Sequence, residues 1–219
     1  MAPAIERRMM SPSRTSAPRV VHPLPLRIMH WAGAISVICM ILSGWAIYNA
    51  SPSLPFTFPR GMTLGGWLAA GIAWHISVMW VLFIDGGAYL LYGFFSGHFR
   101  RDILPGSPRA VIRDMWAALT FRLGHRLGHY NAVQRLLYAG VIAVICLSVV
   151  TGLAIWKPVQ LAWLTDLFGG YPIARNIHLA AMICIVLFLI VHLALVMIFP
   201  RTLVAMIVTT PVESEETVP

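Results

Sequence analysis

The sequence predicts an all-α membrane protein, built as a bundle of four transmembrane helices with both termini in the cytoplasm. Hydrophobic residues make up 58% of the chain and charged residues only 11%, whereas a soluble domain carries about 25% charged residues. The apolar residues gather in four segments, each long enough for the roughly 20-residue helix that crosses a bilayer. The Lys and Arg residues, finally, lie mostly on one side of those segments.

Residues 1–24 are rich in Pro, Ser and Arg, and they predict a disordered cytoplasmic tail. The first span is expected from Leu26 to Tyr48. A short loop rich in proline, residues 50–61, leads to the second span, expected from Leu64 to Phe94. The second span exceeds the length of a simple crossing, so it is expected to tilt or to extend beyond the membrane.

The longest polar connection, residues 97–131, holds apolar residues at helical spacing between Ala110 and Leu123. This pattern favours an amphipathic helix lying on the membrane surface. A partly ordered basic loop fits the same residues equally well.

The third span is expected from Val133 to Trp156 and the fourth from Arg175 to Phe199. A short apolar connection, residues 157–172, joins them. The membrane domain thus covers residues 25–200, and residues 201–219 form a C-terminal tail on the cytoplasmic side.

The distribution of positive charge predicts the orientation of the spans. All but three of the 16 Lys and Arg residues lie near one side of the membrane, and the exceptions are Arg60, Lys157 and Arg175. Because basic residues flanking spans stay in the cytoplasm, both termini and the long connection are expected there. The two short apolar loops then face the periplasm, and the protein is expected in a bacterial inner membrane.

The fourth span carries two histidines, His178 and His192, fourteen positions apart. In a helix they lie on nearly the same face and roughly 21 Å apart along the axis. Imidazoles at membrane depth are costly and usually functional. One face with a histidine near each side of the membrane suits two stacked haems, which require two further ligands.

Two of the eight histidines fit that requirement by depth. His22, His98, His125 and His129 lie outside the spans or at their ends, where polar surface residues are expected. His30 lies at the cytoplasmic depth of His192, and His75 lies nearer to His178. The sequence therefore predicts two iron-ligand pairs, His30 with His192 and His75 with His178.

Glycines and arginines surround these histidines. Gly44 and Gly152 occur in a weak internal repeat, Ser43-Gly44 and Thr151-Gly152. They lack side chains where a flat macrocycle could approach a helix, although glycines that pack helices together give the same pattern. Arg27 inside and Arg175 outside, with Arg60 and Lys157, are candidates to bind haem propionates.

Other chemistry is not indicated. The three cysteines lie inside apolar segments, so we expect them to be small buried residues without a redox or metal role. No Cys-x-x-Cys-His stretch occurs, so covalent haem attachment is not expected. The net charge of +8 lies outside the spans and gives no support for a nucleic-acid partner.

Several stretches resemble the bacterial cytochrome b561 family over about residues 22–200. They are Arg27-Ile28-Met29-His30-Trp31, Ser43-Gly44, His75, Asn131-Ala132-Val133-Gln134-Arg135-Leu136-Leu137-Tyr138 and the spaced pair His178 and His192. This broad family includes the cytochrome b subunits of nickel–iron hydrogenase, formate dehydrogenase and thiosulfate reductase. The thiosulfate-reductase-like branch, whose partners are often molybdopterin enzymes, resembles the chain best.

The resemblance implies a particular function. It implies two b haems across the membrane, a quinone site beside the cytoplasmic haem, and a periplasmic redox partner that meets the outer haem. The chain is then an electron-transfer subunit of a membrane oxidoreductase. Its oligomeric state stays open.

Two alternatives use the same residues. The second of them, a transporter, fits poorly, because no intramembrane carboxylate apart from Asp85 accompanies the histidines. A stand-alone enzyme that oxidises superoxide and reduces quinone would use Arg60, Lys157 and Arg175 to attract the anion. A transporter that uses the histidines as a proton or metal path would hold no haem. Asp85 is the intramembrane carboxylate that such a path could use.

Overall fold

The computed structural model describes residues 22–104, 107–120 and 131–209. Within these ranges the chain forms helices and no strand. Four helices of the described residues are long and apolar enough to cross a membrane. They are α1 (Leu24–Ala50), α2 (Leu68–Phe95), α4 (Ala132–Trp156) and α6 (Tyr171–Ile198). The predicted fold class, a four-helix membrane bundle, is confirmed.

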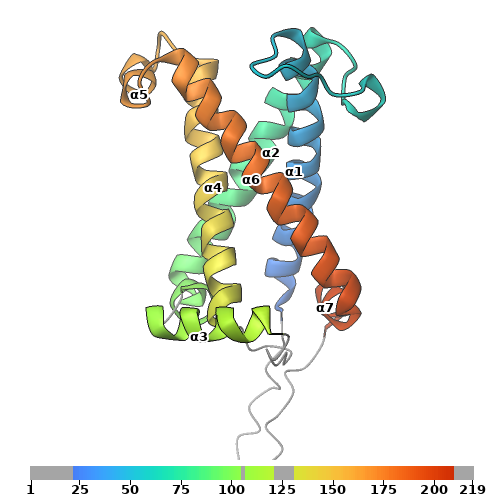
Figure 1. Cartoon of the computed structure of the whole chain (residues 1–219), viewed down its shortest axis with the longest axis vertical. Helices are drawn as coiled ribbons and strands as arrows, with labels where there is room; N and C mark the ends of the chain where they lie inside the picture. The colour runs from blue at the N-terminus through green and yellow to red at the C-terminus, as the bar shows by residue number, and fades with distance from the viewer. Residues whose placement is uncertain (1–21, 105–106, 121–130, 210–219) are drawn as a thin grey trace, which may run out of the picture.

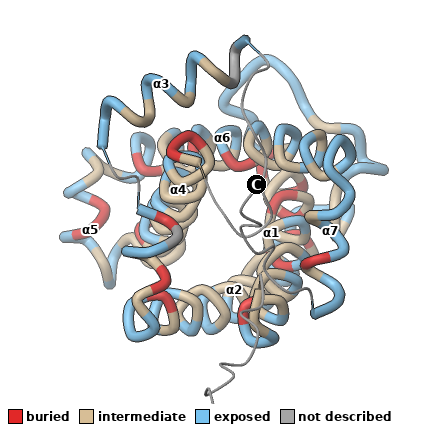
Figure 2. Tube along the Cα trace, turned by 90° about the horizontal axis from the view of Figure 1, so that it is seen from below, coloured by how far each residue is buried: buried red, intermediate tan, exposed pale blue. Residues whose placement is uncertain are grey.

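The four long helices form two antiparallel hairpins. α1 packs along α2, and α4 packs along α6. Viewed end-on in Figure 2, the four helices form a ring. We call the end of the bundle that carries the loop between α1 and α2 the outer end, and the opposite end the inner end (Figure 1).

Shorter helices occupy both ends of the bundle. α5 (Ala162–Leu167) lies at the outer end, whereas α3 (Pro108–Leu119) and α7 (Pro200–Ile207) lie at the inner end (Figure 1). The chain also forms a 3-10 turn at Arg60–Met62 and a π-helical turn at Phe99–Ile103. The sequence did not predict α5, α7 or these turns.

The hairpin of α1 and α2 closes on a glycine. A Cβ atom added at Gly71 would lie 2.8 Å from the Cβ of Ala46, so the missing side chain lets the two helices approach. Beyond that contact, the backbone N–H of Leu64 donates to the carbonyl of Leu42. The second span therefore begins at Leu68, one turn later than predicted, because Gly65 and Gly66 adopt positive φ angles of 98° and 70° in the loop.

The outer loop of this hairpin is held against the end of α1. The amide side chain of Asn49 both donates to and accepts from the backbone of Phe58, with both distances 2.8 Å. The ring of Phe58 stacks on Trp45 with 4.4 Å between ring centroids. The hydroxyl of Tyr48 bonds the backbone of Leu54. The proline-rich loop is thus a defined structure.

The hairpin of α4 and α6 closes through α5. Ala154, Leu164 and Ala174, one from each helix, form a buried apolar cluster. The hydroxyl of Thr165 donates to the carbonyl of Ala154 at 3.1 Å. Gly170 adopts φ of 95° and allows a sharp turn into α6. The fourth span consequently begins at Tyr171, one turn before the predicted start.

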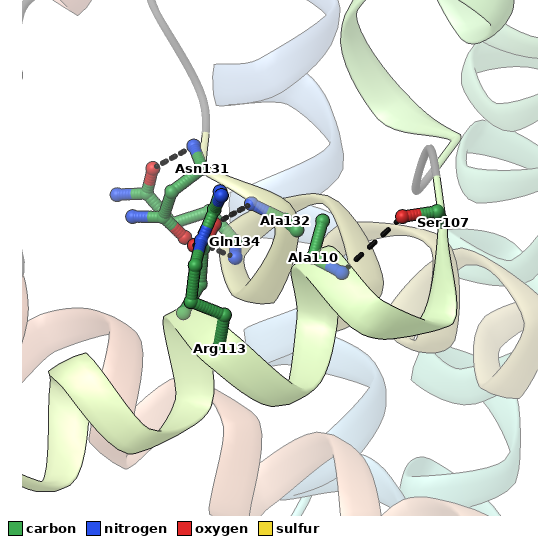
Figure 3. Close-up of polar contacts among 7 residues, drawn as sticks. Ser107, Ala110, Arg113, Asn131, Ala132 and Gln134 are labelled. Carbon is green, nitrogen blue, oxygen red and sulfur yellow. Dashed lines mark hydrogen bonds and ion pairs between the residues drawn. The ribbon is translucent and has the colours of Figure 1, made fainter.

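At the inner end α3 runs across the bundle (Figure 1) and meets the start of α4. The carboxylate of Asp114 accepts from the backbone N–H of Ala132 at 2.9 Å. Asn131 and Gln134 form a reciprocal capping box that begins α4 (Figure 3). The predicted amphipathic helix exists, from Pro108 to Leu119. The last residues of the predicted range, 121–123, lie outside the described residues.

α7 folds back beside the start of α1. The indole N–H of Trp31 donates to the carbonyl of Met206 at 3.1 Å, and Arg27 donates to the hydroxyl of Thr209 at 3.3 Å. Ala205 is almost completely buried. Part of the expected C-terminal tail is therefore a helix against the inner end. The expected disordered tail, up to residue 21, lies outside the described residues.

Two matched glycine substitutions test the packing of α1 on α2. We expect Gly71→Ala to destabilise the protein, because overpacking of a close contact costs about 1–3 kcal/mol. Gly86 on the same helix has open space where a Cβ would be. Gly86→Ala should be neutral or stabilise by up to about 1 kcal/mol through helix propensity. Thermal unfolding in detergent measures both, and equal melting temperatures would contradict the proposed packing.

Candidate functional site

The structure brings together the four intramembrane histidines in the two pairs that the sequence predicted. The rings of His30 on α1 and His192 on α6 lie 6.3 Å apart between centroids. The rings of His75 on α2 and His178 on α6 lie 6.4 Å apart. We call these the inner pair and the outer pair. α6 contributes one histidine to each pair, so this one helix fixes their separation.

The distance within each pair has a chemical meaning. A bond between a transition metal and an imidazole nitrogen is about 2 Å long, and the ring centre lies about 1 Å beyond that nitrogen. Two imidazoles on opposite sides of one metal ion therefore have ring centres about 6 Å apart. Both pairs have this spacing.

The protonation of His178 follows from its hydrogen bonds. Its Nδ1 lies 3.0 Å from the carbonyl oxygen of Ser148. A carbonyl only accepts, so Nδ1 carries the proton and Nε2 keeps its lone pair. The hydroxyl of Thr151 lies 3.1 Å from the same nitrogen. Neutral imidazole with a free Nε2 is the form that binds a metal ion.

His75 is held in the same way by the other hairpin. Its Nδ1 lies 3.0 Å from the hydroxyl oxygen of Ser43. That hydroxyl donates its own proton to the carbonyl of Cys39 at 2.7 Å, so its oxygen accepts from the imidazole. The outer pair thus consists of two imidazoles whose Nδ1 atoms are held by hydrogen bonds and whose Nε2 atoms remain available to bind a metal ion.

Gly44 and Gly152 adjoin the outer pair. A Cβ added at Gly44 would lie 3.5 Å from Cε1 of His75, and one at Gly152 would lie 3.3 Å from Cε1 of His178. Each glycine therefore lies beside an imidazole of its own hairpin. An added Cβ would crowd the ring at Gly152, whereas at Gly44 it would make an ordinary contact. Neither of the two roles considered from sequence, close approach of a macrocycle or close packing of helices, includes this contact.

The inner pair is built differently. Nδ1 of His30 is buried without a hydrogen-bond partner among the described residues. The ring of His30 packs edge-on against Trp31, and the ring of His192 stacks on Phe188 at 5.7 Å with an angle of 14° between the planes. Aromatic contacts, rather than hydroxyl groups, position these two imidazoles.

The predicted propionate-binding arginines occupy matching positions. Arg27 precedes His30 by three residues, and Arg175 precedes His178 by three. Arg27 donates to Thr209, whereas its Nε is buried without a partner among the described residues. Arg175 donates to the backbone carbonyl and the hydroxyl of Ser51 at the end of α1. It therefore links the two hairpins at the outer end.

The remaining polar candidates belong to neither pair. His98 is buried beside Tyr89 and Phe99 near the inner end of α2. A carboxylate oxygen of Asp85 lies 3.0 Å from the position of a Cβ at Gly33, so α2 and α1 meet there. His22 lies just before α1, whereas His125 and His129 lie outside the described residues.

Ser43, Ser148 and Thr151 are site residues that the sequence analysis did not identify. The signal was present, because a hydroxyl precedes each glycine of the repeat, at Ser43-Gly44 and at Thr151-Gly152. The spacing alone did not show that these hydroxyls face a histidine on the neighbouring helix.

The donor set fits haem better than a metal ion bound by protein alone. A protein-only site for a transition metal needs three or four ligands. No group of three or more His, Cys, Asp or Glu side chains that could hold a metal occurs in the described parts of the chain. Two imidazoles that face each other suit a haem iron, because the porphyrin supplies the other four ligands of that iron.

Comparison with known proteins agrees with this chemistry. The family model described as prokaryotic cytochrome b561 matches residues 21–208. A putative protein-methionine-sulfoxide reductase subunit, YedZ1, from Azospira oryzae is 45% identical over 85% of this chain and 95% of its own length. A probable Ni/Fe-hydrogenase B-type cytochrome subunit from Azotobacter vinelandii is 23% identical over 80% of this chain and 78% of its own length.

A further probable hydrogenase cytochrome subunit, from Bradyrhizobium diazoefficiens, is 25% identical over 79% of this chain and 75% of its own length. We expected the thiosulfate-reductase-like branch to resemble the chain best, but none of these three relatives is named as a thiosulfate reductase subunit. A transporter without haem is not supported by a family of b-type cytochromes. The chain belongs to the prokaryotic cytochrome b561 family and is a multi-pass bacterial membrane cytochrome of the b type that takes part in electron transfer.

Proposed function

We propose that this cytochrome holds two b haems and exchanges electrons between the membrane quinone pool and a redox enzyme on the periplasmic side. The observation that carries the proposal is the presence of two imidazole pairs with ring centres 6.3 and 6.4 Å apart. Haem iron held by two imidazoles has no open position, so it supplies electron transfer rather than oxygen chemistry.

The chain's own residues have distinct tasks in this proposal. His30 and His192 hold the inner haem, and His75 and His178 hold the outer haem. Because α6 carries one ligand of each pair, fourteen residues apart, it keeps the two sites roughly 21 Å apart along its axis. Two sites with this separation along the helix cover much of the hydrocarbon core of a membrane, which is about 30 Å thick.

The orientation of the bundle follows the distribution of positive charge. The inner end carries α3, α7 and most of the arginines, including Arg100, Arg101 and Arg135. Basic residues beside spans stay in the cytoplasm, so the inner end and both termini are assigned to the cytoplasm. The quinone site is then beside the inner pair, as the family resemblance implies.

The names of the relatives support a redox enzyme as the partner. The relatives are named as subunits of a protein-methionine-sulfoxide reductase and of Ni/Fe-hydrogenases. Both names describe a subunit of a redox enzyme. We therefore propose a periplasmic redox enzyme, with a molybdopterin enzyme as the class that the family resemblance implies. The outer loop fixed by Asn49 and the exposed side chain of Trp163 offer it a contact surface.

The stand-alone superoxide oxidase gains no specific support from the structure. Two of its three proposed cations are engaged, because Arg175 bonds Ser51 and the ammonium of Lys157 lies 4.6 Å from the centre of the Trp156 ring. If partner-free protein reduces quinone with superoxide faster than the uncatalysed reaction, the electron-transfer subunit is the wrong assignment.

Haem counts of single-histidine variants test the ligand assignment. A pyridine haemochrome assay of detergent-purified protein should give two b haems per chain. His30→Ala and His75→Ala should each retain one, since removing one imidazole leaves the other pair intact. His22→Ala, which changes a histidine outside the spans, should retain two. A full haem content in either intramembrane variant would show that the histidine concerned is not a ligand.

Reduction by a quinol tests the position of the quinone site. We expect a soluble quinol analogue to reduce the remaining haem of the His75→Ala protein rapidly, because the inner pair adjoins the quinone site. The His30→Ala protein retains only the outer haem and should be reduced at least tenfold more slowly. Stopped-flow absorbance in the haem bands measures both rates. The opposite order would place the quinone site at the outer end.

A further inference from the structure

The two hairpins share one hydrogen-bonding arrangement at the histidines of the outer pair. Ser43 on α1 and Thr151 on α4 are completely buried. Each hydroxyl donates to the carbonyl four residues earlier at 2.7 Å, Ser43 to Cys39 and Thr151 to Leu147. Each hydroxyl oxygen then faces Nδ1 of a histidine on the second helix of its hairpin, at 3.0 and 3.1 Å.

A hydroxyl arranged in this way accepts rather than donates. Its proton is already committed to a backbone carbonyl, so its lone pair takes the N–H of the imidazole. His178 has a second acceptor, the backbone carbonyl oxygen of Ser148, at 3.0 Å from the same nitrogen. Both histidines of the outer pair are thereby held in one tautomer.

The inner pair has no such support in the described part of the chain. Nδ1 of His30 has no partner there, and His192 is positioned by its stacking on Phe188. Charge does not separate the two sites, because each has an arginine three residues before one of its histidines, at Arg27 and Arg175. The hydrogen bonds to Nδ1 are the difference between them.

We propose that Ser43 and Thr151 are positioning residues for the outer haem, and that they keep this haem at a lower reduction potential than the inner haem. This inference rests on the proposed di-haem function. An acceptor behind Nδ1–H orients a ligating histidine and makes its Nε2 more basic. A more basic ligand favours ferric over ferrous iron, and hydrogen bonding around a haem ligand is one of the protein's means of setting its potential.

The inference has a consequence for the distribution of electrons. The first electron that the protein takes up should rest on the inner site at equilibrium, because that site has the higher potential. The outer site then fills second. The hydroxyls thus establish a difference in reduction potential between the outer and the inner site. The sequence of either hairpin alone does not reveal this difference.

Redox titration of purified holoprotein in detergent tests this inference. We expect Ser43→Ala and Thr151→Val each to raise the potential of the lower component. A tenfold loss in the preference for ferric iron corresponds to 59 mV for a one-electron couple. The higher component should not move. The double variant should shift the lower component further than either single variant.

Ser148→Ala is the matched control. The Ser148 hydroxyl is buried without a partner among the described residues, whereas its backbone carbonyl accepts from His178. Its replacement should leave both potentials unchanged. Ser43→Thr and Thr151→Ser retain a hydroxyl and should restore values near those of the wild type. A merely structural role would not produce this dependence on the hydroxyl.

The two components are assigned with the single-haem proteins His30→Ala and His75→Ala. If neither accumulates, the criterion is that both hydroxyl variants shift the same component and that this component is the lower one. Unchanged potentials in both variants, a shift of the higher component, or an equal shift in Ser148→Ala would overturn the inference. Fewer than two b haems in the wild-type protein would instead contradict the proposed function.

Discussion

The hydrogen bond from Nδ1 of a buried imidazole to an acceptor on the neighbouring helix is the interaction on which the outer site depends. The hydrocarbon core of a bilayer holds no water to satisfy a polar side chain, so a partner within the protein lowers the cost of an intramembrane histidine. Ser43 and the backbone carbonyl of Ser148 supply that partner to His75 and His178. These bonds occupy Nδ1 of each ring and leave Nε2 out of them.

The architecture follows from repeating this arrangement in two hairpins. In each hairpin the first helix carries a hydroxyl followed by a glycine, and the second helix carries the histidine that this pair of residues receives. The ring lies beside the glycine, and the hydroxyl fixes its rotation. α6 adds His192, fourteen residues after His178 and on nearly the same face, so it takes part in both pairs, whereas α4 contributes a histidine to neither. The resulting bundle has two sites with a shared helix and unequal surroundings.

The sequence predicted the parts of the structure that depend on periodicity and length. Four apolar segments gave the four long helices, and depth along them gave the pairing of His75 with His178 despite the deeper position of His75. Elements that depend on tertiary contacts were missed. α5 has only six residues and is held by Thr165 and by the cluster around Ala154. α7 is held by contacts with Trp31 and Arg27 on a distant part of the chain.

The roles of the small residues likewise depend on the rotation of one helix against another. The repeat Ser43-Gly44 and Thr151-Gly152 was visible, but whether it faced a macrocycle, a helix or an imidazole was not. Arg175 shows the same limit. Its position before His178 suggested a propionate partner, and the structure shows that it also bonds the end of α1 at Ser51. Local spacing identifies which residues are unusual, whereas packing decides what they touch.

Low-temperature electron paramagnetic resonance of the oxidised protein tests the central claim most directly, because it reports the axial ligands of each ferric haem. Two low-spin signals typical of bis-imidazole ligation, one lost in His30→Ala and the other in His75→Ala, are the expected result. A high-spin signal of comparable size in the wild-type protein would indicate an iron with an open position. That result would contradict the assignment of two imidazoles to each haem.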